Sequence, residues 1–212
     1  GGCGGAGQRA GVPLRLEAGQ GWGKRPFSLG GQGIATAALS GHKLGAPKGV
    51  GALYKRDGIE IEPFMHGAGH ESGRRAGTEN VLLSVGLGVA CELAQEWIEK
   101  PQILQLRDHF WARLQETFEE RVVLNGHPIA RLPNTLNVSF IGQSGPDLLA
   151  KLAGVAASTG SACHAGAVEL SAVLKAMGIS SKAGMGTIRF SLGRQTTADE
   201  VEYVIQQIQK AI

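Results

Sequence analysis

Cysteine, charge and long apolar runs are all scarce in this chain of 212 residues. The three cysteines are Cys3, Cys91 and Cys163. They are too few and too scattered for a disulfide framework or a four-thiolate zinc site. We therefore expect a reducing compartment, cytoplasmic or organellar, and not secretion. Charged residues make up 18%, and the net charge of +3 is too small to indicate a nucleic-acid surface.

Hydrophobic runs are short as well. No apolar run approaches the roughly 20 residues that a membrane-spanning helix needs, so the sequence predicts no membrane segment. Glycine, in contrast, is abundant: 33 of the 212 residues are glycine, about twice the usual share. Residues 1–11 carry almost no apolar side chain, and we expect a flexible lead-in there.

From Ile34 onward the pattern becomes regular and alternates between strands and helices. Residues 34–39, 50–54, 135–141 and 187–192 are predicted to be strands. Apolar residues at helical spacing predict helices over 81–100, 102–120, 147–153 and 169–178. Cys91 lies on the first of these helices and is expected to be buried in the hydrophobic core. Thr197 and Glu200 form a capping box that predicts a final helix, and residues 62–80 are expected to be loops. The alternation indicates the α/β class.

Ser40, His42 and Lys43 follow directly on the first predicted strand, where α/β proteins commonly hold ligands. A desolvated lysine at such a place can act as an amine nucleophile toward an aldehyde cofactor. The alternative is a solvated lysine and a structural histidine in a turn.

Cys163 lies in a stretch of small residues, 154–168, that favours a mobile loop with a reachable thiol. The adjacent His164 could take the proton of that thiol; the alternative is a buried cysteine that serves only packing. Arg189, on the last predicted strand, could bind a substrate carboxylate through two hydrogen bonds, or could simply lie on the polar side of its strand. His66 and His70 with Cys163 and His164 make only a weak zinc pattern, and no metal is predicted.

Six sequence blocks together resemble, in the same order, the pyridoxal-phosphate-dependent cysteine desulfurases and selenocysteine lyases of the class V aminotransferase family. The blocks are SGHK with GAPKGVGALY, GHESGRRAGTEN, NTLNVSF, STGSACHAG and IRFSLGRQTTADEVEYVI. The resemblance covers about residues 12–212 and corresponds to the C-terminal half of the family's chain. It implies a partial fold-type-I large domain over 12–98 and a smaller C-terminal α/β domain over 99–212.

The resemblance also implies a role for each matching residue. Lys43 matches the lysine that binds pyridoxal phosphate covalently, and Cys163 matches the cysteine that accepts sulfur. The other implied residues contact the cofactor or the substrate: Ser40 and His42 for the phosphate, Gln20 for the ring oxygen, Glu17 for the ring nitrogen, Thr78 for the phosphate of the partner subunit's cofactor, and Arg189 for the substrate carboxylate. The role of Thr78 implies a homodimer.

The implied reaction removes sulfur from L-cysteine and leaves alanine and an enzyme persulfide, as in iron–sulfur cluster assembly, with a sulfur-acceptor protein as a possible partner. Two alternatives stay open: a selenocysteine lyase, favoured by His164 directly after Cys163, and a catalytically incomplete relative that serves as a binding or dimerising module. The family has aspartate where this chain has Glu17. The amino-terminal half of the family's chain, which these 212 residues do not include, supplies a phosphate loop and a ring-stacking histidine. We therefore expect little or no turnover from these 212 residues alone.

Overall fold

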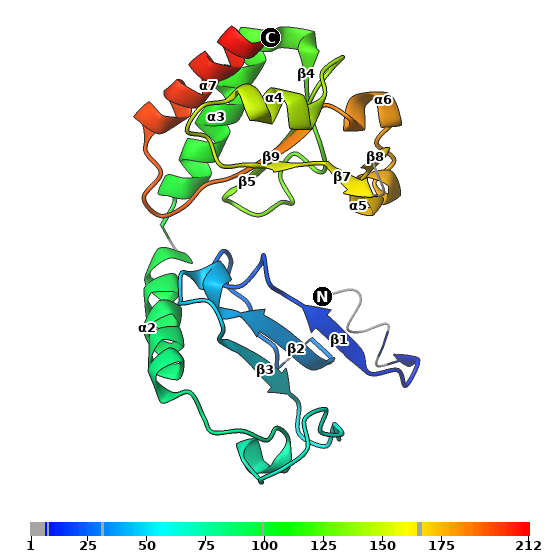
Figure 1. The fold of residues 1–212 in the computed structure, drawn as a ribbon, viewed down its shortest axis with the longest axis vertical. Coiled ribbons are helices and arrows are strands. Elements are labelled where there is room, and N and C mark those ends of the chain that lie inside the picture. Colours follow the sequence, from blue (N-terminus) through cyan, green and yellow to red (C-terminus); the bar gives the residue numbers. More distant parts are fainter. Residues whose placement is uncertain (1–6, 8, 31, 99, 165–166) are drawn as a thin grey trace. The chain divides into compact units, whose positions relative to one another are not determined.

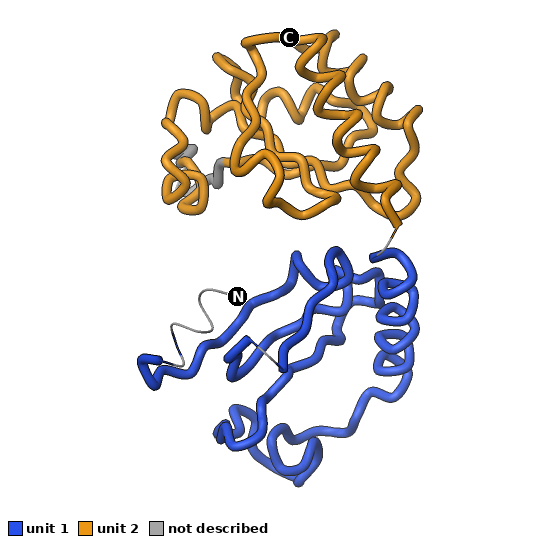
Figure 2. Tube along the Cα trace, turned by 180° about the vertical axis from the view of Figure 1, so that it is seen from behind, with its two compact units in different colours: residues 1–99 blue, residues 100–212 orange. Residues whose placement is uncertain are grey.

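A computed structural model describes residues 7, 9–30, 32–98, 100–164 and 167–212, with the side chains of 161–169 left out. The chain divides into two compact units, Gly1–Glu99 and Lys100–Ile212 (Figure 1 and Figure 2). The lead-in expected over 1–11 lies mostly outside the described residues.

A three-stranded sheet forms the centre of the first unit. Its order is β1 (Leu14–Glu17), β2 (Ile34–Ser40) and β3 (Gly51–Lys55). β1 runs parallel to β2, and β3 runs antiparallel to it. The predicted strands 34–39 and 50–54 are confirmed, whereas β1 was missed because its four residues alternate Leu with charged residues in a glycine-rich context.

Helix α2 (Val81–Ile98) lies beside this sheet and packs against the turn that follows β2 (Figure 1). Ala90 and Ala94 pack with Leu44 and Ala46, which follow β2. Cys91 is exposed, so the expectation that it lies in the core was wrong: its neighbour Ala90 takes the inward direction instead.

Helix α2 also corrects the expectation about apolar runs. Among the described residues it is the one helix long and apolar enough to cross a membrane, by length and composition only. The prediction that no apolar run approaches the length of a membrane-spanning helix was therefore wrong. The segment includes the small residues Gly86, Gly88 and Ala90, which add length without charge but are less hydrophobic than leucine or valine.

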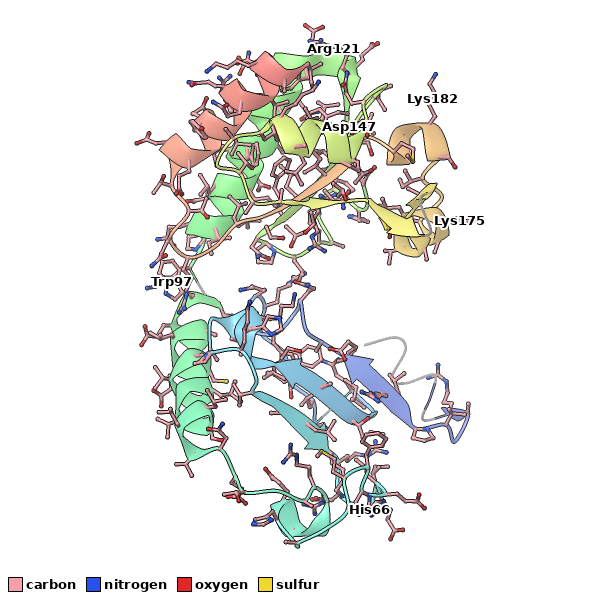
Figure 3. All side chains as sticks on the ribbon, in the orientation of Figure 1. His66, Trp97, Arg121, Asp147, Lys175 and Lys182 are labelled. Carbon is pink, nitrogen blue, oxygen red and sulfur yellow. The ribbon has the colours of Figure 1, made fainter. Side chains whose placement is uncertain are left out.

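The segment between β3 and α2 is irregular, as predicted for 62–80, apart from the short helix η2 (Glu71–Gly73). Figure 3 shows His66 in this loop.

The second unit is an antiparallel sheet of order β4 (Val122–Leu124), β5 (Thr135–Phe140), β9 (Thr187–Ser191) and β6 (Ser158–Thr159). Alternate residues of β5 and β9 face a core formed with α3 (Gln102–Phe118), α4 (Gly145–Lys151) and α7 (Ala198–Ala211). The fully buried members of this core include Leu114, Val138, Ile188 and Ile208. These strands and helices confirm the alternation on which the α/β prediction rests.

The start of α7 confirms the predicted capping box. The Thr197 hydroxyl accepts from the Glu200 amide at 3.2 Å, and the Glu200 carboxylate accepts from the Thr197 amide at 2.9 Å. Each bond satisfies an amide that the first helical turn leaves without a partner.

One predicted helix, 169–178, was wrong in its first part. Residues Ala167–Leu170 are strand β8, which pairs with β7 (Ser161–His164) in a hairpin. Helix α5 (Ala172–Ala176) begins only after Ser171, whose hydroxyl accepts from the Val173 amide at 3.3 Å and caps the helix. Helix α6 (Ser181–Gly184) and the short helix η3 (Glu119–Arg121) complete the unit.

Candidate functional site

The carboxyl ends of β1 and β2 meet at one edge of the first sheet. The two strands are parallel, and Glu17 at the end of β1 is in register with Ala38, two residues before the end of β2. The turn that follows β1 carries Gln20, and the turn that follows β2 carries Lys43. Ligands of open α/β sheets bind at this edge, so the topology brings both turns to one candidate site.

Lys43 lies in the 3-10 turn η1 (Gly41–Leu44), which two features hold tightly. Gly41 donates its amide to the Val50 carbonyl at 2.9 Å, and a Cβ at Gly41 would lie only 2.8 Å from that carbonyl oxygen. The turn ends at Gly45, whose φ of 91° is left-handed. Lys43 itself is exposed, and within the described residues its amine makes no hydrogen bond or ion pair. Within this unit the lysine is thus solvated and not desolvated, and a rigid turn presents its amine.

Three polar side chains share this edge with the lysine. Ser40 stands at the N-cap of η1, but its hydroxyl does not cap the turn, so it remains available for a ligand. His42 and Gln20 are exposed. Gln20 lies in a turn closed by the Gly21 amide, which donates to the Ala18 carbonyl at 2.8 Å. The site thus offers an amine, a hydroxyl, an imidazole, an amide and the Glu17 carboxylate.

Thr78 is not part of this group. It is exposed in the loop that ends at α2, three residues before the helix begins. Leu44 of the turn η1 packs near Ala90. Ala90 lies nine residues after Val81, the first residue of α2, or about 14 Å along the helix axis. The loop that carries Thr78 thus meets α2 at its first residue, whereas Leu44 of η1 packs against the second half of the helix.

Arg189 lies on the polar face of the second sheet. Its register partners are Asn137 on β5 and Ser158 on β6, and its Nη2 donates to the Ser158 hydroxyl at 3.1 Å. Its Nε is buried and has no partner among the described residues. This guanidinium thus has donor capacity left for an anion.

A buried polar network continues this face. Asn125 donates from Nδ2 to the Asn137 Oδ1 and to the Ser139 hydroxyl, both at 2.8 Å, and the Ser139 and Thr187 hydroxyls are 2.8 Å apart. Ser139 and Thr187 are fully buried, and each such group needs a partner. The network makes this side of the sheet rigid beside Arg189.

Cys163 belongs to strand β7, where its backbone is paired with Val168 of β8. Its side chain, like that of His164, lies outside the described residues. The hairpin has a defined root: Gly160 donates to the Thr187 carbonyl at 2.9 Å, and Ser171 donates to the Gly160 carbonyl at 2.8 Å. Part of the segment 154–168, which was predicted to be a mobile loop, thus belongs to a short hairpin anchored to β9, the strand of Arg189.

Metal ligands do not gather in the part of the chain that the structure describes, since no group of three or more His, Cys, Asp or Glu side chains is found there. His70 Nδ1 is buried without a partner among those residues.

The sequence reasoning missed Ser158 and the network around Asn125. Ser158 precedes Cys163 by five residues in a run of small residues. No pattern in that run predicts that Ser158 pairs with Arg189. Only the register of β6 with β9 places it beside Arg189.

Comparison with known proteins agrees with this architecture. An α/β unit with a lysine at a strand end, followed by a second unit with an antiparallel sheet, is part of the fold-type-I class of pyridoxal-phosphate enzymes. The chain belongs to the class-V aminotransferase family, whose model matches residues 5–204.

Among curated relatives, the cysteine desulfurase NifS of Azotobacter vinelandii is 43% identical over 203 residues, which are 94% of this chain and 50% of the relative. A cysteine desulfurase of Gluconacetobacter diazotrophicus is 45% identical over 203 residues, 92% of this chain and 50% of the relative. The chain thus spans about half the length of the curated relatives it matches.

Solved structures give the same result. A NifS-like protein from Rickettsia africae superposes with a TM-score of 0.88 at 27% identity, covering 98% of this chain and 56% of that one. Another NifS-like protein has a TM-score of 0.84 at 34% identity, with 94% and 52% covered.

Proposed function

We propose that this chain is the lysine- and cysteine-bearing part of a pyridoxal-phosphate-dependent cysteine desulfurase. The observation that carries the proposal is the parallel pairing of β1 with β2, which brings Glu17, Gln20, Ser40, His42 and Lys43 to one edge of a sheet. The names of the relatives, which are cysteine desulfurases, support sulfur over selenium as the element removed.

The side chains at this edge fit pyridoxal phosphate. The cofactor has an aldehyde, a phosphate, a ring oxygen and a ring nitrogen. Lys43 offers an unpaired amine for the aldehyde, and Ser40 and His42 offer a hydroxyl that caps nothing and an exposed ring for the phosphate. Gln20 and Glu17 would hold the ring oxygen and the ring nitrogen.

When bound, pyridoxal phosphate withdraws electrons from the substrate Cα–H bond. Lys43 Nζ then takes that proton as general base and returns it as general acid. Arg189 orients the substrate through its carboxylate, with Ser158 holding one side of the guanidinium.

The Cys163 thiolate attacks the sulfur of L-cysteine. The substrate C–S bond breaks as a sulfur–sulfur bond forms, and the electron pair of the C–S bond goes to the substrate Cβ. That carbon takes up a proton, so the products are alanine and a persulfide on Cys163. A reducing compartment would keep the thiol available between turnovers, and a sulfur-acceptor protein would remove the terminal sulfur.

Thr78 points to a homodimer in this proposal. Thr78 is exposed in the loop before α2, which leaves it accessible to the cofactor phosphate of a partner subunit, as the family resemblance implies. A dimer would therefore hold two sites, each built from both subunits.

Covalent labelling of Lys43 tests the cofactor assignment directly. The chain is incubated with pyridoxal phosphate and reduced with borohydride, which fixes a lysine-bound pyridoxal group, and the modified peptide is located by mass spectrometry. We expect the label on Lys43, its loss in Lys43→Arg, and no change in Lys48→Arg, a matched exposed lysine five residues away. Equal labelling of Lys43 and Lys48 would contradict the assignment.

A further inference from the structure

One row of polar side chains crosses the second sheet on the face opposite its core. Asn137 of β5 is in register with Arg189 of β9, and Arg189 is in register with Ser158 of β6. Asn125 extends the row, because it directly follows β4 and its backbone amide donates to the Asn137 carbonyl at 2.9 Å. Residues opposite each other on neighbouring strands have Cβ atoms about 4.5–5.5 Å apart, so the four side chains are neighbours.

The side-chain amide of Asn137 has a fixed orientation. Asn125 Nδ2 donates to Asn137 Oδ1 at 2.8 Å and to the Ser139 hydroxyl at the same distance. Asn125 is only 3% exposed, so packing holds it in place. Because Oδ1 of Asn137 accepts from Asn125, Nδ2 is the branch of the amide that remains for another partner. Asn137 is half-buried, and within the described residues its Nδ2 makes no hydrogen bond.

Asn137 Nδ2 and the Arg189 guanidinium cannot bond to each other, since both are donors only. One nitrogen of Arg189, Nη2, donates to the Ser158 hydroxyl at 3.1 Å. Another, Nε, is buried and has no partner in the described part of the chain. Two neighbouring groups with unused donors require an acceptor that lies against both.

Charge indicates that this acceptor is an anion. No Asp or Glu occurs in residues 121–146, 148–168 or 170–198, and these ranges contain all four strands of the sheet. Arg189 is half-buried, and its guanidinium forms no ion pair with any residue that the structure describes. A carboxylate has two oxygens that accept only, so one can accept from Arg189 and the other from Asn137.

We propose that Asn137 is a second substrate-binding residue, whose Nδ2 donates to the substrate carboxylate that Arg189 holds. This rests on the proposed function, in which Arg189 binds the carboxylate of L-cysteine. Arg189 supplies the charge, and Asn137 fixes the plane of the carboxylate by holding its second oxygen. A substrate amide would direct N–H donors at these donors and would be rejected. All four residues of the row belong to the second unit.

Side-chain NMR of the 212-residue chain without cofactor tests the proposal. The nitrogen-15 signals of Arg189 Nε–H and Asn137 Nδ2–H are followed while L-alanine, the proposed product, is added. L-Alaninamide, which lacks the carboxylate, is the control ligand. We expect L-alanine to shift both signals with one common affinity and L-alaninamide to shift neither.

Substitutions at position 137 separate its role from that of Arg189. Asn137→Ala should weaken L-alanine binding about tenfold, as expected for one hydrogen bond to a charged group. Asn137→Asp keeps the shape of the side chain but places a carboxylate beside Arg189, and we expect it to abolish binding. Thr135→Val removes a hydroxyl two residues away on the same face of β5 and should leave the affinity unchanged. Circular dichroism of each variant verifies its fold.

Two results would overturn the proposal. The first is native affinity for L-alanine in Asn137→Ala or Asn137→Asp, which would leave Arg189 to hold the carboxylate without Asn137 and would not touch the proposed function. The second is the absence of any L-alanine-dependent shift of the Arg189 signal in the native chain. That result would also remove Arg189 from the proposed function, whereas labelling of Lys43 tests the cofactor assignment separately.

Discussion

Single glycines hold the turn that presents Lys43. The amide and Cα of Gly41 approach the Val50 backbone so closely that no side chain fits between them. The sequence marked this turn through the residues that follow a buried strand, but it could not show why position 41 must be glycine. That requirement comes from β3, which returns beside β2 and brings Val50 into contact.

Gly41→Ala should therefore destabilise the first unit. The new methyl would force the Val50 carbonyl to move, at a cost of about 1–3 kcal/mol. Urea unfolding with hydrogen exchange of amides in residues 9–98 measures the change. Gly88→Ala is the control: its Cβ would meet nothing within 4 Å, and alanine should stabilise the helix by up to about 1 kcal/mol. Equal effects of the two substitutions would rule out steric crowding at Gly41.

At the scale of elements, one carboxylate connects α3 to α7. Glu202 accepts from Arg113 at 3.0 Å and lies 3.1 Å from His109. The hydrogen bond from Arg113 is the main cause that lowers the pKa of Glu202, and His109 adds to it. A carboxylate with a lowered pKa stabilises the fold above its unfolded pKa and loses this effect as the pH falls through the folded value.

We expect Glu202→Gln to change how the second unit responds to acid. Between about pH 5 and pH 3 the native chain should lose more thermal stability than the variant, by no more than about 3 °C because water still reaches the half-buried pair. Thermal unfolding followed by circular dichroism across this range measures it. Glu120→Gln is the control, a carboxylate exposed on η3. If the two variants show identical pH profiles, Glu202 does not contribute in this way.

The sequence predicted long, periodic elements well and short ones poorly. Strand β5 shows the alternation of Leu136, Val138 and Phe140 with polar residues. Helix α7 shows a capping box at Thr197 and apolar residues at helical spacing, so both elements can be predicted from local sequence. The hairpin β7–β8 does not, because its residues are small and its second strand shares Glu169 and Leu170 with what looked like a helix. Strand β6 has two residues, and only its pairing with β9 defines it.

At the scale of the candidate site, the sequence predicted the lysine turn but not its surroundings. Ser40, His42 and Lys43 are adjacent in sequence, so a strand and a turn suffice to group them. Glu17 and Gln20 are twenty or more residues away, and only the parallel register of β1 with β2 brings them to the same edge. The partners of Arg189 likewise come from two other strands.

For the whole molecule, the proposed dimer predicts that two defective subunits complement each other. Lys43→Ala removes the cofactor lysine, and Thr78→Ala removes a phosphate contact from the other subunit's site. A mixed dimer should regain one intact site, in which Lys43 of one subunit meets Thr78 of its partner.

Pyridoxal phosphate affinity measures this complementation, in chains mixed with the half of the Azotobacter vinelandii NifS relative that this chain does not match. The Thr78→Ala homodimer should bind the cofactor about tenfold to a hundredfold more weakly, as expected for one hydrogen bond to a charged group. Half of the sites in the mixed dimer should bind with native affinity. Uniformly weak binding in the mixed dimer would place Thr78 outside the partner's site.

The hairpin root at Gly160 sets a limit on travel. Cys163 follows Gly160 by three positions, so its Cα atom can move no farther than about 11 Å from Gly160 while the bond to Thr187 holds. That bond ends on the strand of Arg189, so the backbone of Cys163 stays within this distance of a fixed point on β9. Under the proposed function, a sulfur acceptor would therefore have to approach the hairpin, because the backbone between Gly160 and Cys163 is too short to carry the cysteine far from β9.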